Sequence, residues 1–276
     1  MGTRTDVPGQ PPGAAAVTPP PAPAPRGLRL TRRGRRTLLA VLLVAAVGAG
    51  AAAAEVVGWP DRLLPGLLDG PDCTVSTTDG DVALDAADAL RLTDAAVAGT
   101  TPPSGADPAP ERDAAVLAAL RTRDGALSCR LTSSERRERA GLAREDETAS
   151  GLTPRARTVR TALRRAAGRL PDGGFAPGGV TTGHMAGSAH YEGRAIDVFF
   201  RPAGGENARH GWLVAQWLVA HAADLDVATV IFDDRIWTAS ASAQGWRPYV
   251  PPGGPTRDPV LRHLDHVHVD VARGGA

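Results

Sequence analysis

Two short stretches in the second half of the chain carry side chains that can bind a metal ion. Residues 188–197 read Ser-Ala-His-Tyr-Glu-Gly-Arg-Ala-Ile-Asp and place one imidazole, His190, seven residues before one carboxylate, Asp197. Residues 263–268 read His-Leu-Asp-His-Val-His and offer three more imidazoles and a carboxylate. Two histidines and one aspartate, with a fourth position left for water, suit a catalytic zinc ion. All seven histidines lie after residue 183, so we expect histidine chemistry only in the last third of the chain.

The residues around these stretches predict the elements that position them. Short β-like runs occur at 195–200, 227–232 and 267–271, and Gly-rich turns separate them. Residues 206–223 are apolar on most sides and predict a buried helix packed on a sheet. Thr153 as N-cap and Pro154 at the first helical position predict a further helix that ends near Arg169. Strands mixed with helices predict an α+β domain of about 120 residues.

The predicted strand at 267–271 determines on which side of the sheet the last histidines lie. Side chains alternate along a strand, so His266 and His268 point the same way, with Asp270 beyond them. Gly193 permits a turn that would bring His190 and Asp197 to one metal ion from opposite sides. Only one of the two histidines in the strand needs to bind the metal. The other is then free to donate a proton or stabilise charge.

The N-terminal segment has the composition of a cytoplasmic arm and a membrane anchor. Residues 1–36 hold seven Arg and one Asp, a charge of +6, and predict a disordered basic arm. Residues 37–54 carry no charge and would span roughly 27 Å as a helix, so we expect a transmembrane anchor at 37–58. The arginines favour a cytoplasmic N-terminus and an extracytoplasmic remainder. The alternative is a signal peptide that is cleaved near the alanines at 51–54.

Charge and cysteine content limit the function classes of the remaining chain. The net charge is +1, so the residues after 36 carry +1 − 6 = −5, which argues against binding of nucleic acid. Residues 70–150 hold Ala/Leu-rich runs at 81–98 and 109–128 and predict a small helical region without visible chemistry. Outside the membrane, Cys73 and Cys129 are expected to form a disulfide, the alternative being two free thiols.

The two metal-binding stretches resemble a known superfamily of zinc proteins. The pattern Ser-x-His-x-x-Gly-x-Ala-x-Asp at 188–197 is similar to the zinc motif of the D-alanyl-D-alanine peptidases. The closing His-x-His resembles the same superfamily, which also includes the lysostaphin-like and murein endopeptidases and the Hedgehog signalling domain. The resemblance covers about residues 155–273 and implies a small antiparallel sheet with flanking helices. The whole tail of the chain also resembles a group of membrane-anchored actinobacterial proteins that carry this domain.

Carried over by position, the resemblance implies Zn²⁺ held by His190, Asp197 and His268. Such an ion activates water and polarises an amide carbonyl. His266 matches a second active-site imidazole of the murein endopeptidase branch, and His263 matches another.

The resemblance leaves the general base open. Some D-alanyl-D-alanine peptidases place a glutamate base three residues before the last ligand, where this chain has Asp265, one methylene shorter. The base is therefore His266 or, in second place, Asp265. The usual substrate-gripping arginine upstream of the motif has no clear equivalent between residues 169 and 188.

Two functions from different classes follow from these expectations. The first is a membrane-anchored zinc hydrolase that cleaves an amide bond in peptidoglycan stem peptides, as a carboxypeptidase or an endopeptidase. The second is a non-catalytic zinc module that binds cell-wall fragments or a partner protein. Ser188 is expected to shape the motif loop and not to act as a nucleophile. His184 could line the cleft but is expected to be an ordinary loop residue.

Overall fold

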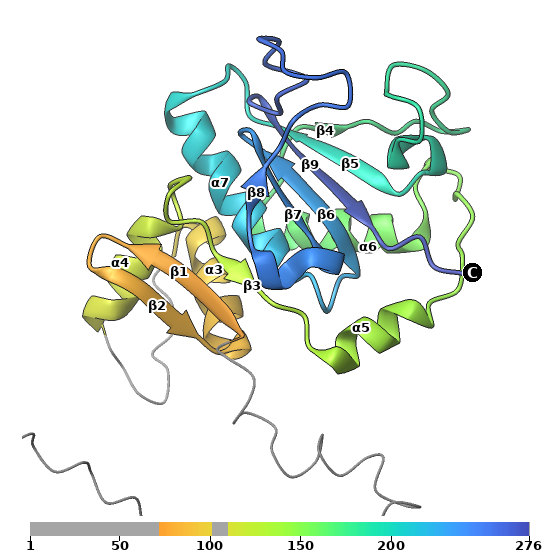
Figure 1. Ribbon diagram of the computed structural model, residues 1–276. Helices are drawn as coiled ribbons and strands as arrows, with labels where there is room; N and C mark the ends of the chain where they lie inside the picture. The colour runs from red at the N-terminus through yellow and green to blue at the C-terminus, as the bar shows by residue number, and fades with distance from the viewer. Residues whose placement is uncertain (1–71, 101–109, 276) are drawn as a thin grey trace, which may run out of the picture. The chain divides into compact units, whose positions relative to one another are not determined.

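An antiparallel sheet forms the centre of the protein in this computed structural model, which describes residues 72–100 and 110–275 (Figure 1). The larger sheet of the described residues has six strands, all paired antiparallel. In spatial order they are β4 (Asp172–Gly173), β5 (Ala195–Phe199), β9 (His266–Val271), β6 (Val227–Phe232), β7 (Arg235–Thr238) and β8 (Arg247–Pro248). The strand that comes last in the sequence, β9, therefore lies between β5 and β6.

Alternation along the two central strands gives the sheet one apolar face and one polar face. In β9, Val267, Val269 and Val271 are at most 1% exposed and belong to the hydrophobic core. The residues that alternate with these valines are His266, His268 and Asp270, which therefore point to the other face. The strands β5 and β9 pair with Asp197 opposite His268. A shift of one residue would bury these polar groups in the core, so the valines fix the register.

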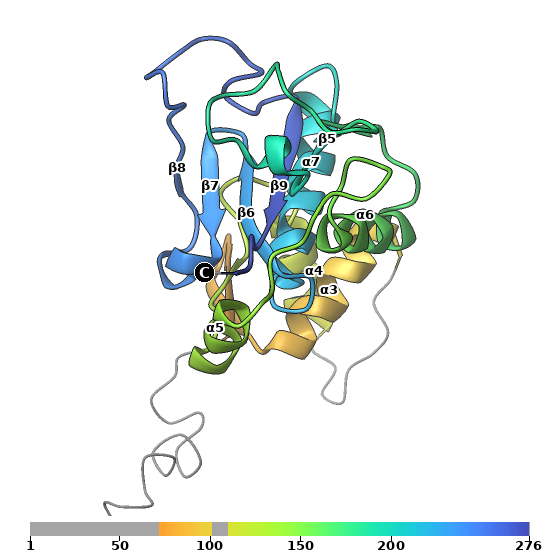
Figure 2. The ribbon, with the colours of Figure 1, turned by 90° about the vertical axis from the view of Figure 1, so that its right-hand side faces the viewer.

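Helices cover the apolar face of this sheet. In Figure 2, α6 (Pro154–Ala167), α7 (Gly205–Ala220) and α3 (Ala86–Ala98) all lie to the same side of the strands. Helix α7 is buried along most of its length, as its all-round apolar pattern predicts. Thr153 caps α6 by accepting a hydrogen bond from the Ala156 amide, and Pro154 occupies the first turn, which confirms the predicted start of this helix.

The part of the predicted helical region that the structure describes also contains a small sheet. The helices of this region are α3, α4 (Pro110–Ala119) and α5 (Ser133–Ala140). The second sheet has the order β2-β1-β3, with β1 at Cys73–Thr77, β2 at Gly80–Leu84 and β3 at Ser128–Cys129. The predicted helical runs at 81–98 and 109–128 are longer than the helices. The first run begins within β2, which is too short to show a period, and in the second run α4 ends at Ala119.

Both sheets share one hydrophobic core. Val75 of β1, Leu92 of α3, Leu127 and Trp237 of β7 belong to a single cluster of buried side chains that extends to the central valines of β9. The described residues, 72–100 and 110–275, accordingly belong to one compact unit. The coarse prediction of antiparallel strands combined with helices is confirmed.

No helix within residues 72–100 and 110–275 is long and apolar enough to cross a membrane. The predicted basic arm at 1–36 and the predicted anchor at 37–58 lie outside the described residues.

The predicted disulfide between Cys73 and Cys129 is confirmed. The two cysteines lie directly opposite one another where β1 pairs with β3. The bond therefore ties β1 to the segment that leads into α5, across a sequence separation of 56 residues. A link across such a long loop removes much conformational entropy from the unfolded chain.

We expect the double variant Cys73→Ala/Cys129→Ala to lose about 4 kcal/mol of unfolding free energy, because the unfolded chain regains the entropy of the open loop. Chemical denaturation of both proteins with and without a reducing agent measures this loss. Reduction should shift the wild-type midpoint to that of the variant and leave the variant unchanged. Equal midpoints for the oxidised wild type and the variant would contradict a stabilising bond.

Candidate metal centre

Strand pairing brings Asp197 and His268 together on the polar face of the large sheet. They face one another across the β5–β9 ladder, and His268 Nδ1 lies 3.1 Å from Asp197 Oδ1. Neighbouring side chains of paired antiparallel strands are held at this close range by the backbone hydrogen bonds. The distance between these two groups is therefore set by the core of the protein and not by a flexible loop.

His190 reaches the same point from a short 3₁₀ helix, η1 (Ala189–Glu192), that precedes β5. Ser188 caps η1 by accepting from the His190 amide, so it shapes the motif loop as expected. Gly193 ends η1 with a left-handed φ of 60°, and a Cβ there would lie 2.7 Å from the Gly151 carbonyl oxygen. Glycine at 193 is thus required both by conformation and by space, as the turn between the two predicted ligands demands.

The His190 ring is oriented by the backbone on its far side. Its Nδ1 donates to the Gly174 carbonyl at 2.7 Å, which leaves Nε2 as the free nitrogen. That nitrogen lies 3.2 Å from Asp197 Oδ1 and 3.1 Å from His268 Nδ1. A Cβ at residue 174 would come within 2.3 Å of the His190 ring, so a glycine is needed for this contact. A backbone acceptor behind a ligating imidazole is the usual way in which metal sites fix the ring.

The three predicted ligand atoms form a nearly equilateral triangle with edges of 3.1, 3.1 and 3.2 Å. Ligands about 2.0–2.1 Å from a tetrahedral ion are separated by roughly 3.3 Å, so the triangle fits one face of such a tetrahedron. The donors are two imidazoles and one carboxylate, and His190 and Asp197 are only 2% and 8% exposed. The structure thus brings together His190, Asp197 and His268 in an arrangement that suits a metal ion.

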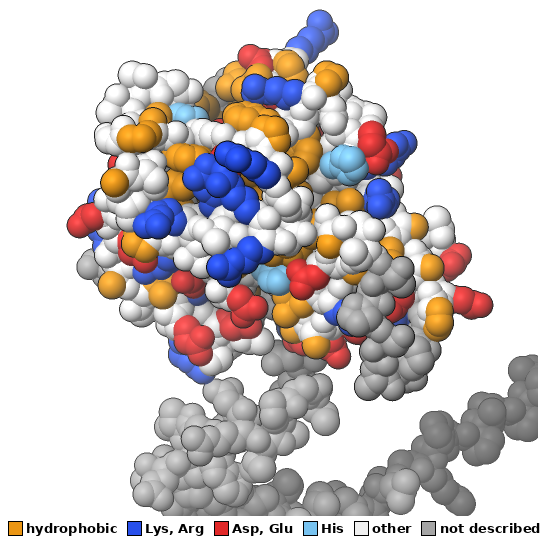
Figure 3. Space-filling model, turned by 180° about the vertical axis from the view of Figure 1, so that it is seen from behind, with side chains coloured by type: hydrophobic (Ala, Val, Ile, Leu, Met, Phe, Trp, Pro, Cys, Tyr) orange, Lys and Arg blue, Asp and Glu red, His pale blue; other side chains and the backbone are white. Residues whose placement is uncertain are grey.

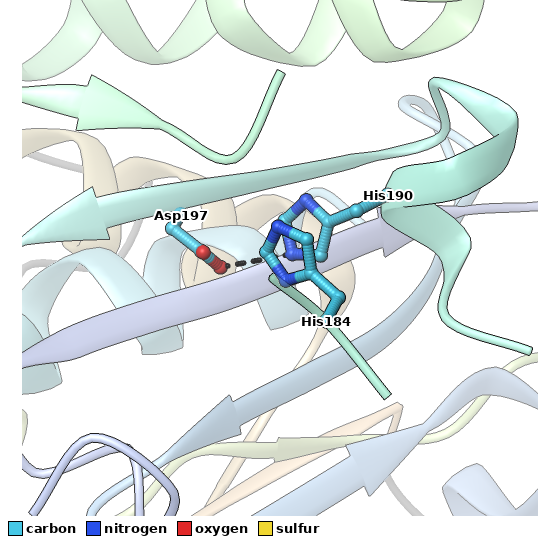
Figure 4. A group of neighbouring side chains, drawn as sticks. All are labelled: His184, His190 and Asp197. Carbon is cyan, nitrogen blue, oxygen red and sulfur yellow. Dashed lines mark ion pairs between the residues drawn. The ribbon is translucent and has the colours of Figure 1, made fainter. Parts of the chain in front are cut away.

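The structure adds His184, which sequence reasoning treated as an ordinary loop residue. Donor atoms of His184, His190 and Asp197 lie within 4.8 Å of one another and could hold a metal ion (Figure 4). The His184 ring is stacked on that of His190 with centroids 3.9 Å apart. The Tyr191 hydroxyl holds this loop by accepting from the His184 amide and donating to its carbonyl. Only the six-residue spacing from His190 could have pointed to it in the sequence, and that spacing is too common to be specific.

The carboxylate and the imidazoles strongly perturb one another. Burial raises the pKa of Asp197, but hydrogen bonds from His190 and His268 outweigh burial and hold that pKa far below its usual range. Burial lowers the pKa of His268, yet its contacts with Asp197 and Asp270 prevail and raise it to about 9. Without a metal ion, His268 is therefore protonated at neutral pH and donates to an ionised Asp197. A bound cation would replace that proton.

His266 and Asp265, the two candidates for the base, form a pair beside the triangle. His266 Nε2 is on the side of the metal cluster, 3.8 Å from Asp197 Oδ1. His266 Nδ1 lies 2.8 Å from Asp265 Oδ1, and Arg201 Nε donates to Asp265 Oδ2 at 2.7 Å. Both carboxylate oxygens of Asp265 are thus engaged on the side away from the triangle. Of the two groups, His266 is therefore the one with a nitrogen on the side of the triangle.

The third predicted catalytic residue, His263, lies on the loop before β9. Its ring centroid is 4.7 Å from that of His266 and 5.7 Å from that of His268. Burial, followed by the charges of His268 and His266, lowers the pKa of His263 to about 3, so its ring is neutral. The β6–β7 turn holds this loop, since the Asp233 amide donates to the His263 carbonyl at 2.8 Å. The β6–β7 turn thus supports the loop that carries His263.

A separate cavity of about 570 Å³ lies near the end of β5. Phe199, Arg201, His210 and Leu213 are among its lining residues, which include none of the triangle. Figure 3 shows that hydrophobic side chains are exposed among arginines and a histidine on the face opposite to that of Figure 1. The remaining histidines lie outside the cluster: His210 pairs with Glu206 and His221 with Asp94.

We expect His268→Ala to reduce bound metal from about one ion per chain to none, because it removes one corner of the triangle. His266→Ala should keep the ion, since the three ligand atoms remain. Elemental analysis of the purified full-length variants after equilibration with Zn²⁺ measures the stoichiometry, with His221→Ala as a control outside the cluster. Loss of metal from His266→Ala would overturn this division of roles.

Metal affinity should also depend on pH in a defined range. Because the pKa of His268 is raised to about 9, an incoming ion must displace its proton below that pH. We expect the apparent affinity for Zn²⁺ to rise about tenfold per pH unit and to level off near pH 9. Asp197 adds nothing to this slope, since its pKa is far below the range. Calorimetry in buffers of different ionisation enthalpy should detect proton release at pH 7, and a pH-independent affinity between pH 6 and 8 would disagree with the pairing.

The chain is similar to one family over part of its length. The family described as VldE, C-terminal domain, matches residues 148–260, which is less than half of the 276 residues. The matched segment contains His184, His190 and Asp197 but ends before β9, so the partners from that strand lie outside it. No curated protein and no solved structure matches the chain.

Proposed function

We propose that the protein is a membrane-anchored, zinc-dependent hydrolase of peptide bonds in peptidoglycan stem peptides, of the D,D-carboxypeptidase or endopeptidase type. The observation that carries the proposal is the triangle of His190 Nε2, Asp197 Oδ1 and His268 Nδ1, with edges of 3.1–3.2 Å. Its support from the sequence is the motif at 188–197, which resembles that of the D-alanyl-D-alanine peptidases. Membership of the Hedgehog/D-alanyl-D-alanine peptidase superfamily is part of the same proposal.

Zinc is the metal that best suits this donor set. Two imidazoles and one carboxylate are typical of catalytic zinc sites, which keep the fourth position for water or substrate. When bound, zinc would supply an acidified water and a Lewis acid for the substrate carbonyl. The chain contributes the rigid support, because two of the three ligands stand on paired central strands. The third, His190, is held by the Gly174 carbonyl behind it.

In the proposed reaction His266 transfers the protons. Its Nε2, on the cluster side, would accept a proton from the attacking water and later deliver it to the departing amine. Asp265 would orient the ring from behind instead of acting as the base, since its oxygens are engaged by His266 and Arg201. His263 would remain neutral beside His266 and limit the access of water to it.

The location and the substrate of the proposed enzyme are inferred from the sequence and the disulfide. We infer an extracytoplasmic catalytic domain from the uncharged run at 37–54, the preceding arginines and the disulfide, which persists in oxidising compartments. Peptidoglycan stem peptides are inferred from the resemblance of the motif.

A non-catalytic zinc module is the second candidate, and His184 favours it. Structural zinc sites have four protein ligands, whereas catalytic sites keep one position open. His184 brings a donor within 4.8 Å of those of His190 and Asp197 and could close the fourth position. It stands on a loop, while Asp197 and His268 belong to central strands, so it could leave without disturbing the sheet.

Full-length protein loaded with Zn²⁺ should release a new amine from purified muropeptides, detected by mass spectrometry. His266→Ala should retain zinc and lose turnover by about 10²–10⁴-fold, because proton transfer is removed while the ligands stay. Zinc at full occupancy without any product would contradict the hydrolase.

The variant His184→Ala separates the two candidate functions. In a closed site it should change the absorption spectrum of the Co²⁺-substituted protein, because a water replaces a nitrogen ligand. An open site should give the same spectrum with and without the His184 ring. His221→Ala provides the matched control, since its imidazole pairs with Asp94 outside the cluster.

A further inference from the structure

A row of three side chains supports the candidate base from behind. Asp265 and His266 are 7% and 5% exposed, so the carboxylate and the imidazole interact with little water between them. The third member, Arg201, is 54% exposed at its side chain and forms the outer end of the row. None of the three belongs to the triangle of candidate metal ligands, and Arg201 was not singled out by its sequence context.

The row determines which nitrogen of His266 carries the proton. An ionised carboxylate can only accept hydrogen bonds, so the 2.8 Å contact between Asp265 Oδ1 and His266 Nδ1 requires hydrogen on Nδ1. In the neutral ring, Nε2 then holds the lone pair, and this nitrogen is on the side of Asp197. The opposite tautomer would leave His266 without a basic nitrogen facing the metal centre.

Arg201 keeps Asp265 ionised, as the Nδ1-protonated tautomer of His266 requires. Its Nε donates to Asp265 Oδ2 at 2.7 Å, which fixes the plane of the carboxylate and favours its ionised form. Burial disfavours the charged carboxylate, yet the hydrogen bonds from His266 and Arg201 keep the pKa of Asp265 below its usual value. Without Arg201, the buried carboxylate of Asp265 would keep only its hydrogen bond with His266.

The fold holds the guanidinium in place although the side chain is half exposed. Arg201 Cζ lies 4.2 Å from the centre of the Phe199 ring. Phe199 is the β5 residue opposite His266, and the Phe200 amide donates to the Asp265 carbonyl at 2.8 Å. The end of β5 therefore carries Arg201 over Asp265, and the aromatic ring limits the directions in which the guanidinium can move.

We propose that Arg201 is a positioning residue, which acts through Asp265 to keep the Nδ1-protonated tautomer of His266 with Nε2 free towards the metal centre. The effect of Arg201 on turnover rests on the proposed function, whereas the effect of Arg201 on the tautomer of His266 does not. The guanidinium of Arg201 contributes a directed hydrogen bond as well as a positive charge, because its rigid plane points Nε at Asp265 Oδ2.

The test uses full-length, Zn²⁺-loaded protein with ¹⁵N-labelled histidine and compares Arg201→Met with Arg201→Lys. The ¹⁵N shifts and couplings of His266 report which ring nitrogen is protonated. Arg209→Met is the matched control, since Arg209 is 55% exposed and pairs with Glu206 on the surface. Metal content and thermal unfolding are measured for each variant to confirm that it is folded and loaded.

We expect hydrogen on Nδ1 in the wild type and in Arg209→Met, and a mixture of tautomers in Arg201→Met. Turnover of muropeptides should fall about 10–100-fold in Arg201→Met with unchanged KM and zinc content. Arg201→Lys should recover part of both, because an ammonium can still bind the carboxylate.

The outcomes separate this proposal from the proposed function. If the wild type hydrolyses nothing, the hydrolase is wrong, and the nitrogen shifts still decide the role of Arg201 in orienting His266. Hydrogen on Nε2 in the wild type would overturn the positioning role. The same conclusion would follow if Arg201→Met kept the wild-type tautomer, or if it lost the tautomer without any effect on the turnover of an active enzyme.

Discussion

The pairing of β5 with β9 is the constraint on which the rest of the site depends. It sets Asp197 opposite His268 and Phe199 opposite His266, so that one register places both a candidate ligand and the candidate base. The opposite faces of the same strands are fully apolar, and Ile196, Val198, Val267 and Val269 are at most 2% exposed. The free energy gained by burying these side chains therefore offsets the cost of bringing a carboxylate and several imidazoles together. Loops add His190, His184 and His263 to a centre whose geometry the sheet has already defined.

The polar side of the sheet is organised in two layers. The inner layer is the triangle of His190, Asp197 and His268, whose atoms contact one another directly. The outer layer consists of acceptors and charges behind it: the Gly174 carbonyl, Asp270, and the pair of Asp265 and Arg201. Each outer group fixes the ring or the charge of an inner or neighbouring one. Such support is what keeps a site within the tolerance that metal binding and proton transfer require.

Much of this architecture could be predicted from the sequence, but some short strands and some contacts of the site could not. The strands at 195–200, 227–232 and 267–271 and the helix at 206–223 were found because each has a clear apolar pattern over its length. The strands β1, β2 and β3 were missed because five or two residues beside Ala-rich runs give no period to measure. The candidate ligands were accessible through motif spacing. His184, Gly174 and Arg201 were not, since their roles depend on the path of the backbone and have no recognisable spacing in the sequence.

The position of β9 within the sheet has a consequence for the order of folding. This strand follows all the others of its sheet in the sequence, yet it lies between β5 and β6 and pairs with both. During synthesis the two neighbours emerge first, and they must remain apart or separate again until the segment from His266 to Val271 can insert. Its insertion closes the sheet and delivers His266 and His268 in the same event. An ion held by His190, Asp197 and His268 together could therefore be bound only after β9 has inserted.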